Sequence, residues 1–381
     1  MGKDLKKNKL LITTTKSLTL ERFLYPICNK LDKELDIEIH IGSRDIKGLN
    51  SKWSKYKFFE INYPKSWREL LNPIKFLKLI IKINNLIYTN EIKYIYVHTP
   101  IASNVIRIAN VFNLRKKPII IFQVHGFRFY GKTFSIGKIF FFIIEFLLCL
   151  FCTNYIITIN KFDYKVAKLF KLFSMKNVFL VKGVGIDSNK LKPYYKKNFS
   201  NKSKIIGTVA TYNKEKGYET LLKVAKELRE YKFVCYGSGS YEYYKKKAEI
   251  KKINNIKFNN FTDEIEKEIS NFDVMFLPSK REGLNVSIQE SLFLGIPVVT
   301  TNSRGCKDVL EGSEINYLFN ENDIKTASRL LRDILKLDLK DYNKLRTKCL
   351  NHAYTNYDSK IITIDYISIF KKILLKGNDK N

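Results

Sequence analysis

The sequence contains no Asp-x-Asp motif, so it lacks the closely spaced carboxylate pair that commonly chelates a divalent metal. Cys149 and Cys152 form its single C-x-x-C, and no second pair or nearby histidine completes a zinc set. The other four cysteines lie far apart, which predicts free buried thiols in a reducing compartment. We therefore expect no metal site.

Uninterrupted apolar runs of membrane-spanning length are also missing. The longest candidate, residues 136–152 (IGKIFFFIIEFLLCLFC), is broken by Lys138 and Glu145 into runs far below the roughly 18–20 apolar residues that crossing requires. The N-terminal apolar run is too short for a secretion signal, which predicts a cytoplasmic chain. We interpret residues 136–152 as a buried core helix in preference to a membrane-surface helix, because a helix that is apolar all round is usually internal.

Acidic residues are few: 37 Asp plus Glu stand against 68 Lys plus Arg, for a formal net charge of +31. This excess favours contact with polyanions or with anionic lipid. The basic residues are spread along the chain, with short clusters such as 115–117 and 245–247, and form no single arm. The net charge therefore names no partner by itself.

Short β-branched and aromatic runs alternate with longer helical patterns, which is typical of parallel βαβ units. The 381 residues, 45% of them apolar, suffice for two cores. Residues 182–204 lose the periodicity and gain Gly, Pro, Ser, Asn and Lys, which indicates a junction. We predict an α/β architecture of two Rossmann-like doubly wound domains facing across a cleft, 1–181 and 182–358. A last helix at about 359–376 is expected to pack back on the first domain.

The candidate strands indicate where functional residues should lie. The predicted strands of the first half are 10–14, 37–41, 58–61, 94–97, 119–124, 155–159 and 178–181, and those of the second half are 204–210, 232–236, 256–258, 274–278, 297–301 and 317–319. In open α/β sheets ligands bind at the carboxyl ends of strands. We therefore expect the functional residues to follow these strands and to line a cleft.

Residues 281–305 (REGLNVSIQESLFLGIPVVTTNSRG) place Glu282 and Glu290 on either side of a helix start. The backbone N–H groups of Gly283 to Ser287 would point from that helix N-terminus and bind an anion. Phosphate on the amides, with sugar or ribose hydroxyls on the carboxylates, describes a nucleotide sugar. The local alternative is a capping box, in which Glu290 only reaches back to Ser287 at the helix start.

Basic residues follow other strands. Residues 207–222 (GTVATYNKEKGYETLL) put Lys216 and Gly217 at a strand-to-helix turn, where an ammonium can neutralise a diphosphate. The alternative is an ordinary exposed loop lysine. His125 ends an apolar strand beside a glycine and is a ligand candidate, although a lone histidine is more often a packing residue. His98 also ends a strand.

In this order the segments resemble the retaining glycosyltransferases of family four, which have the GT-B fold. Residues 281–305 resemble the E-x7-E region of that family, FTDEIEKEISNFDVMFLPS the segment before it, and EKGYETLL its lysine–glycine loop. VHTPIAS, VHGFRFYG, ITINKFDYKVAK and KGVGID resemble the subgroup that builds bacterial surface polysaccharides on a polyprenyl-diphosphate carrier. The similarity runs through nearly the whole chain.

The resemblance implies that His125 contacts the donor sugar near the reacting centre, that Lys216 holds the diphosphate, and that Glu282 and Glu290 hold sugar and ribose hydroxyls. We assign His125 and Glu282 as catalytic. The candidate donor-binding residues are Lys216, Gly217, Gly283, Leu284, Asn285, Val286 and Glu290. Transfer would retain the anomeric configuration through leaving-group departure and same-face attack, without a divalent metal. We expect no cofactor beyond the nucleotide-sugar co-substrate, which we interpret as a UDP-sugar carrying an N-acetylhexosamine.

One position departs from the family. Relatives usually have an arginine about five residues before the loop lysine, where this chain has Thr211. A second cation for the diphosphate would be Lys214 or Arg304, or is lacking. The Gly-Gly pair that many relatives have after the first strand is replaced by TTTKSLTLERF, as the polysaccharide subgroup tends to have. The candidate acceptor-binding residues are Thr14, Thr15, His98 and Arg128.

We expect the enzyme to act as a peripheral protein at the inner membrane face, on a lipid-linked saccharide acceptor. The expected patch for anionic lipid consists of Arg115 to Lys117, Arg128, Lys132 and Lys138. Two alternatives stay open. A sugar-nucleotide epimerase shares the two-domain plan but needs no lipid-facing surface. A nucleic-acid-binding protein would explain the charge, but no binding module is recognised, so we expect no nucleic-acid partner.

Overall fold

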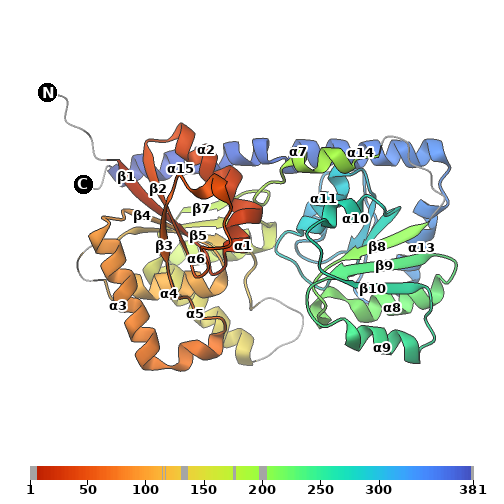
Figure 1. Cartoon of the computed structure of the whole chain (residues 1–381), viewed down its shortest axis with the longest axis horizontal. Helices are drawn as coiled ribbons and strands as arrows, with labels where there is room; N and C mark the ends of the chain where they lie inside the picture. Colours follow the sequence, from red (N-terminus) through yellow and green to blue (C-terminus); the bar gives the residue numbers. More distant parts are fainter. Residues whose placement is uncertain are drawn as a thin grey trace. The chain divides into compact units, whose positions relative to one another are not determined.

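The computed structural model describes residues 7–113, 115, 117–129, 136–174, 177–196 and 204–378. Its contacts divide the chain into two α/β units, each a parallel sheet with helices on its faces (Figure 1). The first unit comprises Met1–Gly185 and Ile362–Asn381, and the second comprises Ile186–Ile361. The division at Gly185 falls inside the stretch 182–204, where the sequence loses its periodicity.

The sheet of the first unit has the strand order β3-β2-β1-β4-β5-β6-β7, with every pair parallel. Its strands are β1 (Asn8–Thr13), β2 (Ile37–Ser43), β3 (Lys57–Glu60), β4 (Tyr94–Val97), β5 (Ile119–Val124), β6 (Tyr155–Thr158) and β7 (Asn177–Leu180). Strands β4 and β6 are buried along their whole length, which explains their continuous apolar sequences. Parallel pairing brings the carboxyl ends of all these strands to one edge.

The helices of the first unit follow the strands in chain order. They are α1 (Ser17–Thr19), α2 (Tyr25–Glu34), α3 (Pro73–Thr89), α4 (Pro100–Val111), α5 (Ile136–Cys152), α6 (Lys161–Ser174) and α15 (Ser359–Asn378), with the short turns η1 (Leu20–Leu24), η2 (Ser51–Trp53) and η3 (Trp67–Leu71). Helices α3, α4, α5 and α6 pack side by side. Helix α15 packs against β4 and β5, since Phe370 contacts the Tyr96 ring with the centroids 5.2 Å apart.

The second unit repeats this plan, in the order β10-β9-β8-β11-β12-β13. Its strands are β8 (Ile205–Val209), β9 (Lys232–Gly237), β10 (Ile256–Asn260), β11 (Val274–Leu277), β12 (Val298–Thr301) and β13 (Leu318–Phe319). Its helices and turns are α7 (Ser188–Leu191), η4 (Lys192–Tyr194), η5 (Lys214–Lys216), α8 (Tyr218–Glu227), α9 (Glu242–Ile250), α10 (Ile265–Ile269), α11 (Val286–Phe293), α12 (Lys307–Leu310), α13 (Ile324–Leu335) and α14 (Leu339–Tyr357). All strand pairs are again parallel, which confirms the predicted pair of Rossmann-like sheets.

Helix α5 differs from the sequence interpretation. Large apolar side chains on its outer face are exposed, among them Ile136 (83%), Phe140 (60%) and Phe151 (72%). The expectation of a core helix is therefore wrong for this face, because a helix that is apolar all round need not be covered all round. Within the described ranges, no helix is long and apolar enough to cross a membrane.

The inner face of α5 contains a buried ion pair. Glu145 Oε2 accepts a 2.9 Å hydrogen bond from Nη2 of Arg107 on α4, whose side chain is completely buried. The same guanidinium donates to Asn104 Oδ1 at 2.6 Å and stacks over the Phe122 ring at 4.0 Å. Glu145 therefore interrupts the apolar sequence while staying mostly buried, and it joins α5 to α4.

All six cysteines are free and buried, as the sequence predicted. Cys149 lies beside the ion pair, with its sulfur 3.7 Å from Arg107 Nη1. Burial raises the pKa of this thiol to about 12, so it is protonated at neutral pH. The C-x-x-C therefore belongs to the packing between α4 and α5.

We predict that Arg107→Leu lowers the free energy of unfolding of the first unit by about 3–5 kcal/mol, because it leaves the Glu145 carboxylate buried without a counter-charge. The double variant Arg107→Leu/Glu145→Leu should recover most of that loss. Both tryptophans, Trp53 and Trp67, belong to the first unit, so urea unfolding followed by tryptophan fluorescence measures this unit selectively. A single variant as stable as wild type would contradict the role of the pair.

Candidate functional site

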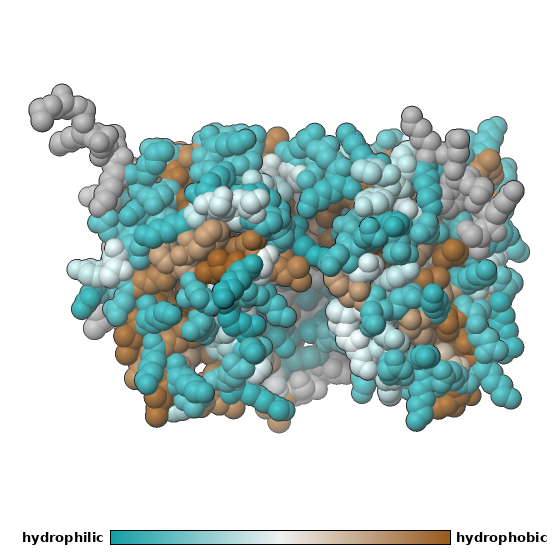
Figure 2. Space-filling view, viewed as in Figure 1, coloured by the Kyte–Doolittle hydropathy of each residue, from teal (hydrophilic) through white to brown (hydrophobic). Residues whose placement is uncertain are grey.

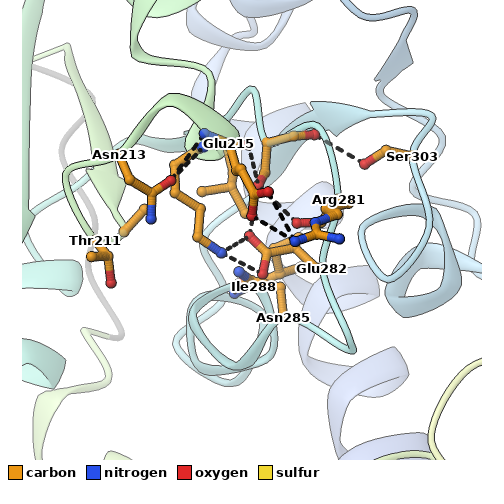
Figure 3. Close-up of polar contacts among 12 residues, drawn as sticks. Thr211, Asn213, Glu215, Arg281, Glu282, Asn285, Ile288 and Ser303 are labelled. Carbon is orange, nitrogen blue, oxygen red and sulfur yellow. Dashed lines mark hydrogen bonds and ion pairs between the residues drawn. The ribbon is translucent and has the colours of Figure 1, made fainter. Parts of the chain in front are cut away.

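At the carboxyl edge of the second sheet, Lys216 and Glu282 bond directly to one another. Lys216 ends η5, after β8, and Glu282 lies in the loop between β11 and α11. The Lys216 ammonium donates to both Glu282 carboxylate oxygens at 2.6 Å (Figure 3). Both side chains are mostly buried, with 20% and 10% of their surface exposed. The two residues that the sequence assigned to diphosphate and sugar hydroxyls therefore lie together.

The backbone around Lys216 is fixed by Asn213 and Gly217. The Asn213 side chain accepts hydrogen bonds from the Glu215 and Lys216 amides at 3.0 and 3.2 Å, which caps η5. Gly217 has φ +73°, and a Cβ there would lie 1.9 Å from the Pro278 carbonyl oxygen. Only glycine fits this close approach, which explains the lysine–glycine pair at the turn.

Glu282 is held from two sides. Ser279 Oγ, which follows β11, lies 2.7 Å from Glu282 Oε1 and donates to it. The loop after β12 holds the backbone, since the Glu282 amide donates to the Arg304 carbonyl at 2.9 Å and Arg304 Nε donates to the Glu282 carbonyl at 3.2 Å. Gly305 permits this contact, because a Cβ there would lie 2.5 Å from the Glu282 carbonyl oxygen.

The structure separates the candidates for a second diphosphate cation. Arg304 is 5% exposed and its side chain donates to the Glu282 backbone carbonyl, which favours a structural role. Lys214 and Thr211 are exposed, and Thr211 Oγ1 lies 3.4 Å from Ser238 Oγ. Of these residues, Lys214 stays the candidate for the second cation, because its ammonium has no partner in the described part of the chain.

Helix α11 begins two residues earlier than the capping-box alternative requires. Its N-cap is Asn285, whose side chain accepts from the Ile288 amide at 2.9 Å. Ser287 lies inside the helix, where its carbonyl accepts from Ser291 Oγ. The capping box between Ser287 and Glu290 is therefore wrong, and half-buried Glu290 does not bind the helix start in that way.

The amides at this helix start are only partly used. Those of Glu282, Asn285 and Ile288 bond within the protein. Those of Leu284, Val286 and Ser287 have no acceptor in the part of the chain that the structure describes. Val286 and Ser287 open a helix N-terminus, where an anion is stabilised by free N–H groups and by the helix dipole. Gly283 lies in the same loop, half-buried.

Sequence reasoning missed several residues of this site. Ser279 orients Glu282, and Arg281 pairs with Glu215 with 2.8 Å between Nη2 and Oε1. Thr301 and Ser303 both donate to the Ser279 carbonyl and tie the two loops together. Their place at the end of β12 or just after β11 and β12 was the available signal, but serine and threonine are common in loops for many reasons.

In the first unit, the residues that follow β4 and β5 form a histidine pair. His98 Nδ1 lies 3.1 Å from His125 Nε2. His98 is completely buried, which favours a positioning role over direct contact with an acceptor, whereas His125 is half-buried. Burial lowers the pKa of His125 to about 4 and that of His98 well below its usual range. Both imidazoles are therefore neutral at pH 7.

The other acceptor candidates differ in exposure. Thr14 is buried and donates to the Lys16 carbonyl at 2.7 Å. Thr15 is almost buried and its hydroxyl lies 2.7 Å from that of Thr99. Arg128 is exposed, and its guanidinium lies over the rings of Trp67 and Phe141. Arg128 is therefore the candidate best placed to meet a ligand from solvent.

A cavity of about 100 Å³ adjoins the histidine pair. Its lining includes Thr99, Pro100, His125, Arg128 and Glu145. His125 and exposed Arg128 thus share one small pocket at the carboxyl edge of the first sheet. No group of three metal-ligating side chains occurs among the residues described.

Comparison with known proteins identifies the class. The model of the family described as glycosyl transferases group 1 matches residues 194–355, which include Lys216, Glu282 and Glu290. The match lies within the second half of the chain, and together with the relatives described below it confirms the resemblance found in the sequence: the chain is a glycosyltransferase.

Two curated relatives match most of the chain. A 41.2 kDa protein of the cps region of Klebsiella pneumoniae is 25% identical over 292 residues, 74% of this chain and 79% of its own. The capsular polysaccharide biosynthesis glycosyltransferase CapM of Staphylococcus aureus is 26% identical over 345 residues, 85% of this chain and 86% of its own.

The fold is shared with solved glycosyltransferase structures. Anabaena HepE, determined in complex with UDP and glucose, superposes with a TM-score of 0.73 at 16% identity, over 96% of this chain and 100% of that one. The two Rossmann-like units are therefore those of the GT-B fold class.

We predict that Glu282→Gln binds UDP, the nucleotide in the HepE structure, about fivefold more tightly than wild type. The neutral amide holds the Lys216 ammonium less strongly, by about 1 kcal/mol, and so releases it for the diphosphate. Isothermal titration calorimetry measures this affinity. The control is Glu215→Gln. It also removes one negative charge near the site, but Glu215 pairs with Arg281 and not with Lys216. Equal affinities in both variants would show that net charge alone decides.

Proposed function

We propose that this glycosyltransferase moves a sugar, with retained anomeric configuration, from a UDP-sugar to a polyprenyl-diphosphate-linked saccharide in the assembly of capsule, O-antigen or another surface glycan. The proposal depends on one observation, the bidentate bond between Lys216 and Glu282 at the start of α11. It puts a cation for a diphosphate and a carboxylate for hydroxyls within reach of one ligand. The capsule relatives and the UDP complex of HepE support it.

In the donor site we assign the diphosphate to Lys216 and to the free amides of Val286 and Ser287. An ammonium and a helix N-terminus both stabilise negative charge, which builds up on the diphosphate as the sugar leaves. We assign Glu282 to the sugar hydroxyls and Glu290 to the ribose. Charge stabilisation by these groups is the basis for proposing activity without a divalent metal.

In the first unit we assign His125 to the donor sugar. As a neutral imidazole it can donate one hydrogen bond to a sugar oxygen and it carries no charge that would oppose a cationic sugar in the transition state. Departure of the leaving group with attack from the same face needs no separate base on the opposite side. Arg128, exposed beside His125 in the same pocket, is our candidate for the acceptor.

We propose a membrane-facing surface on α3 and α5 for the lipid-linked acceptor. On α3, exposed apolar side chains recur at Ile74, Leu77 and Ile81, next to the exposed lysines Lys75, Lys78 and Lys82. Figure 2 shows apolar side chains gathered over the region of α3. The two stripes suit a helix lying in the bilayer interface, with its lysines at the lipid phosphates.

Helix α5 continues this surface. The Trp67 ring, at the turn that precedes α3, packs edge-on against Phe141 of α5 at 5.5 Å. Of the basic patch expected from the sequence, Arg115, Lys117 and Arg128 are exposed and Lys138 is half-exposed, whereas Lys116 and Lys132 lie outside the described residues. The lysines of α3 were not part of that expectation. We propose a peripheral enzyme at the inner face of the membrane.

The donor is tested by incubating the enzyme with UDP-, GDP- and dTDP-sugars and a polyprenyl-diphosphate saccharide, and by following product formation. We expect transfer from a UDP-sugar that persists in EDTA, because Lys216 and the amides supply the positive charge. Lys216→Met should lower kcat/KM about 100-fold, whereas the exposed Lys223→Met on α8 should match wild type. Turnover that stops in EDTA and returns with magnesium would contradict the proposal, as would isomerisation of the donor alone.

Membrane association is tested by co-sedimentation with phosphatidylglycerol vesicles and with phosphatidylcholine vesicles. We expect binding to the anionic vesicles, reduced at least tenfold when Lys75, Lys78 and Lys82 are changed to Gln, since each lysine near an anionic surface contributes about 1 kcal/mol. Phe140→Ser should weaken it as well. The control is Ile250→Ser, which removes an apolar side chain of the second unit that is even more exposed, at 72%. Equal binding to both vesicle types would remove the electrostatic argument.

A further inference from the structure

The bond between His98 and His125 links residues that follow the neighbouring strands β4 and β5. The His98 side chain is completely buried and packs edge-on against the Tyr96 ring, with 4.2 Å between the ring centroids. Its Nε2 atom has no hydrogen-bond partner in the described part of the chain. Among the described residues, the His98 side chain therefore has one polar contact, and that contact is His125.

Because both imidazoles are neutral at pH 7, the bond between Nδ1 of His98 and Nε2 of His125 contains one proton. Either ring can be the donor. If His125 donates from Nε2, His98 has its own proton on Nε2, where a buried N–H group is left without an acceptor. If His98 donates from Nδ1, its Nε2 has no proton and is only an unpaired acceptor.

The second arrangement costs less. Unpaired buried N–H groups are rarer in folded proteins than unpaired acceptors, because a donor that loses water has a single bond to make and cannot share it. In this arrangement His98 donates to His125 Nε2, so His125 must have its own proton on Nδ1. That atom is the ring nitrogen of His125 that His98 does not use.

The backbone next to His98 gives an independent indication. Thr99, between His98 and Pro100, has φ +63°, which is unusual and strained for a β-branched residue. Its hydroxyl accepts from the Thr15 amide at 3.1 Å and lies 2.7 Å from the Thr15 hydroxyl. Strain held by such bonds is typical of functional positions. Here it fixes the chain directly after His98.

We infer that His98 is a positioning residue, which holds His125 with its proton on Nδ1 and so makes His125 a hydrogen-bond donor to an oxygen of the donor sugar. The inference rests on the proposed contact between His125 and that sugar. No residue on the opposite side of His98 supplies an alternative partner among those described, so the direction of the bond is set by His98 itself.

An isosteric pair of variants tests it. His98→Asn can place an amide N–H near the former Nδ1 and should keep kcat within about fivefold of wild type. His98→Asp places an acceptor there, which reverses the bond and moves the His125 proton to Nε2. We expect kcat to fall about 100-fold in His98→Asp while KM for the nucleotide sugar changes less than threefold, as for loss of a hydrogen bond made mainly in the transition state.

Imidazole ¹⁵N NMR measures the tautomer without any assay of turnover. The chain has only four histidines, so selective labelling gives few signals, and His125→Gln and His40→Asn assign them. His40 is buried in the same sheet with its Nε2 bonded to Glu38, and His40→Asn should leave kcat unchanged. We expect His125 to have its proton on Nδ1 in wild type and in His98→Asn.

The outcomes separate this inference from the proposed function. A wild-type His125 protonated on Nε2 would overturn the inference, even if His98→Asp fails to fold. So would a His98→Asp enzyme with the reversed tautomer and full kcat, although the proposed function would then stand. If no donor sugar is transferred by wild type, the proposed function fails, and the role assigned to the tautomer fails with it, whatever the NMR spectrum shows.

Discussion

Parallel strand pairing is the constraint on which the candidate sites depend. In each sheet it brings the carboxyl ends of non-consecutive strands to one edge, so that β8 and β11 place Lys216 beside Glu282 although 66 residues separate them. The same geometry places His98, after β4, beside His125, after β5. Both pairs are thus contacts between loops whose positions are fixed by buried strands.

The Lys216–Glu282 pair is charged, whereas the His98–His125 pair is neutral. Lys216 and Glu282 neutralise one another in the ligand-free chain, so a ligand with both a diphosphate and hydroxyls can replace one internal bond with two external ones. His98 and His125 also satisfy one another by a hydrogen bond, but without charge, since burial keeps both rings neutral. Glycines at 217 and 305 allow the backbone to come close enough for the first pair, and the strained Thr99 fixes the second.

Sequence pattern predicted the strands well, because parallel strands buried on both faces are short, apolar and bounded by polar residues. For the same reason the sequence placed His125, Lys216 and Glu282 in the loops that follow those strands, where the structure has them. What failed depended on tertiary contacts. Asn285 takes the cap that the local alternative gave to Ser287, and α5 leaves one apolar face uncovered. The roles of Ser279 and Arg304 depend on a neighbouring loop that local sequence does not specify.

The division of the chain has a consequence for its synthesis. The first unit is built from residues up to Gly185 and from those after Ile361, so the whole second unit is translated in between. Until α15 leaves the ribosome, Tyr96 and Gln123 lack the covering contacts of Phe370 and Tyr366. The nascent first unit therefore keeps this part of its sheet uncovered until α15 is synthesised, at a stage when the second unit can already have folded.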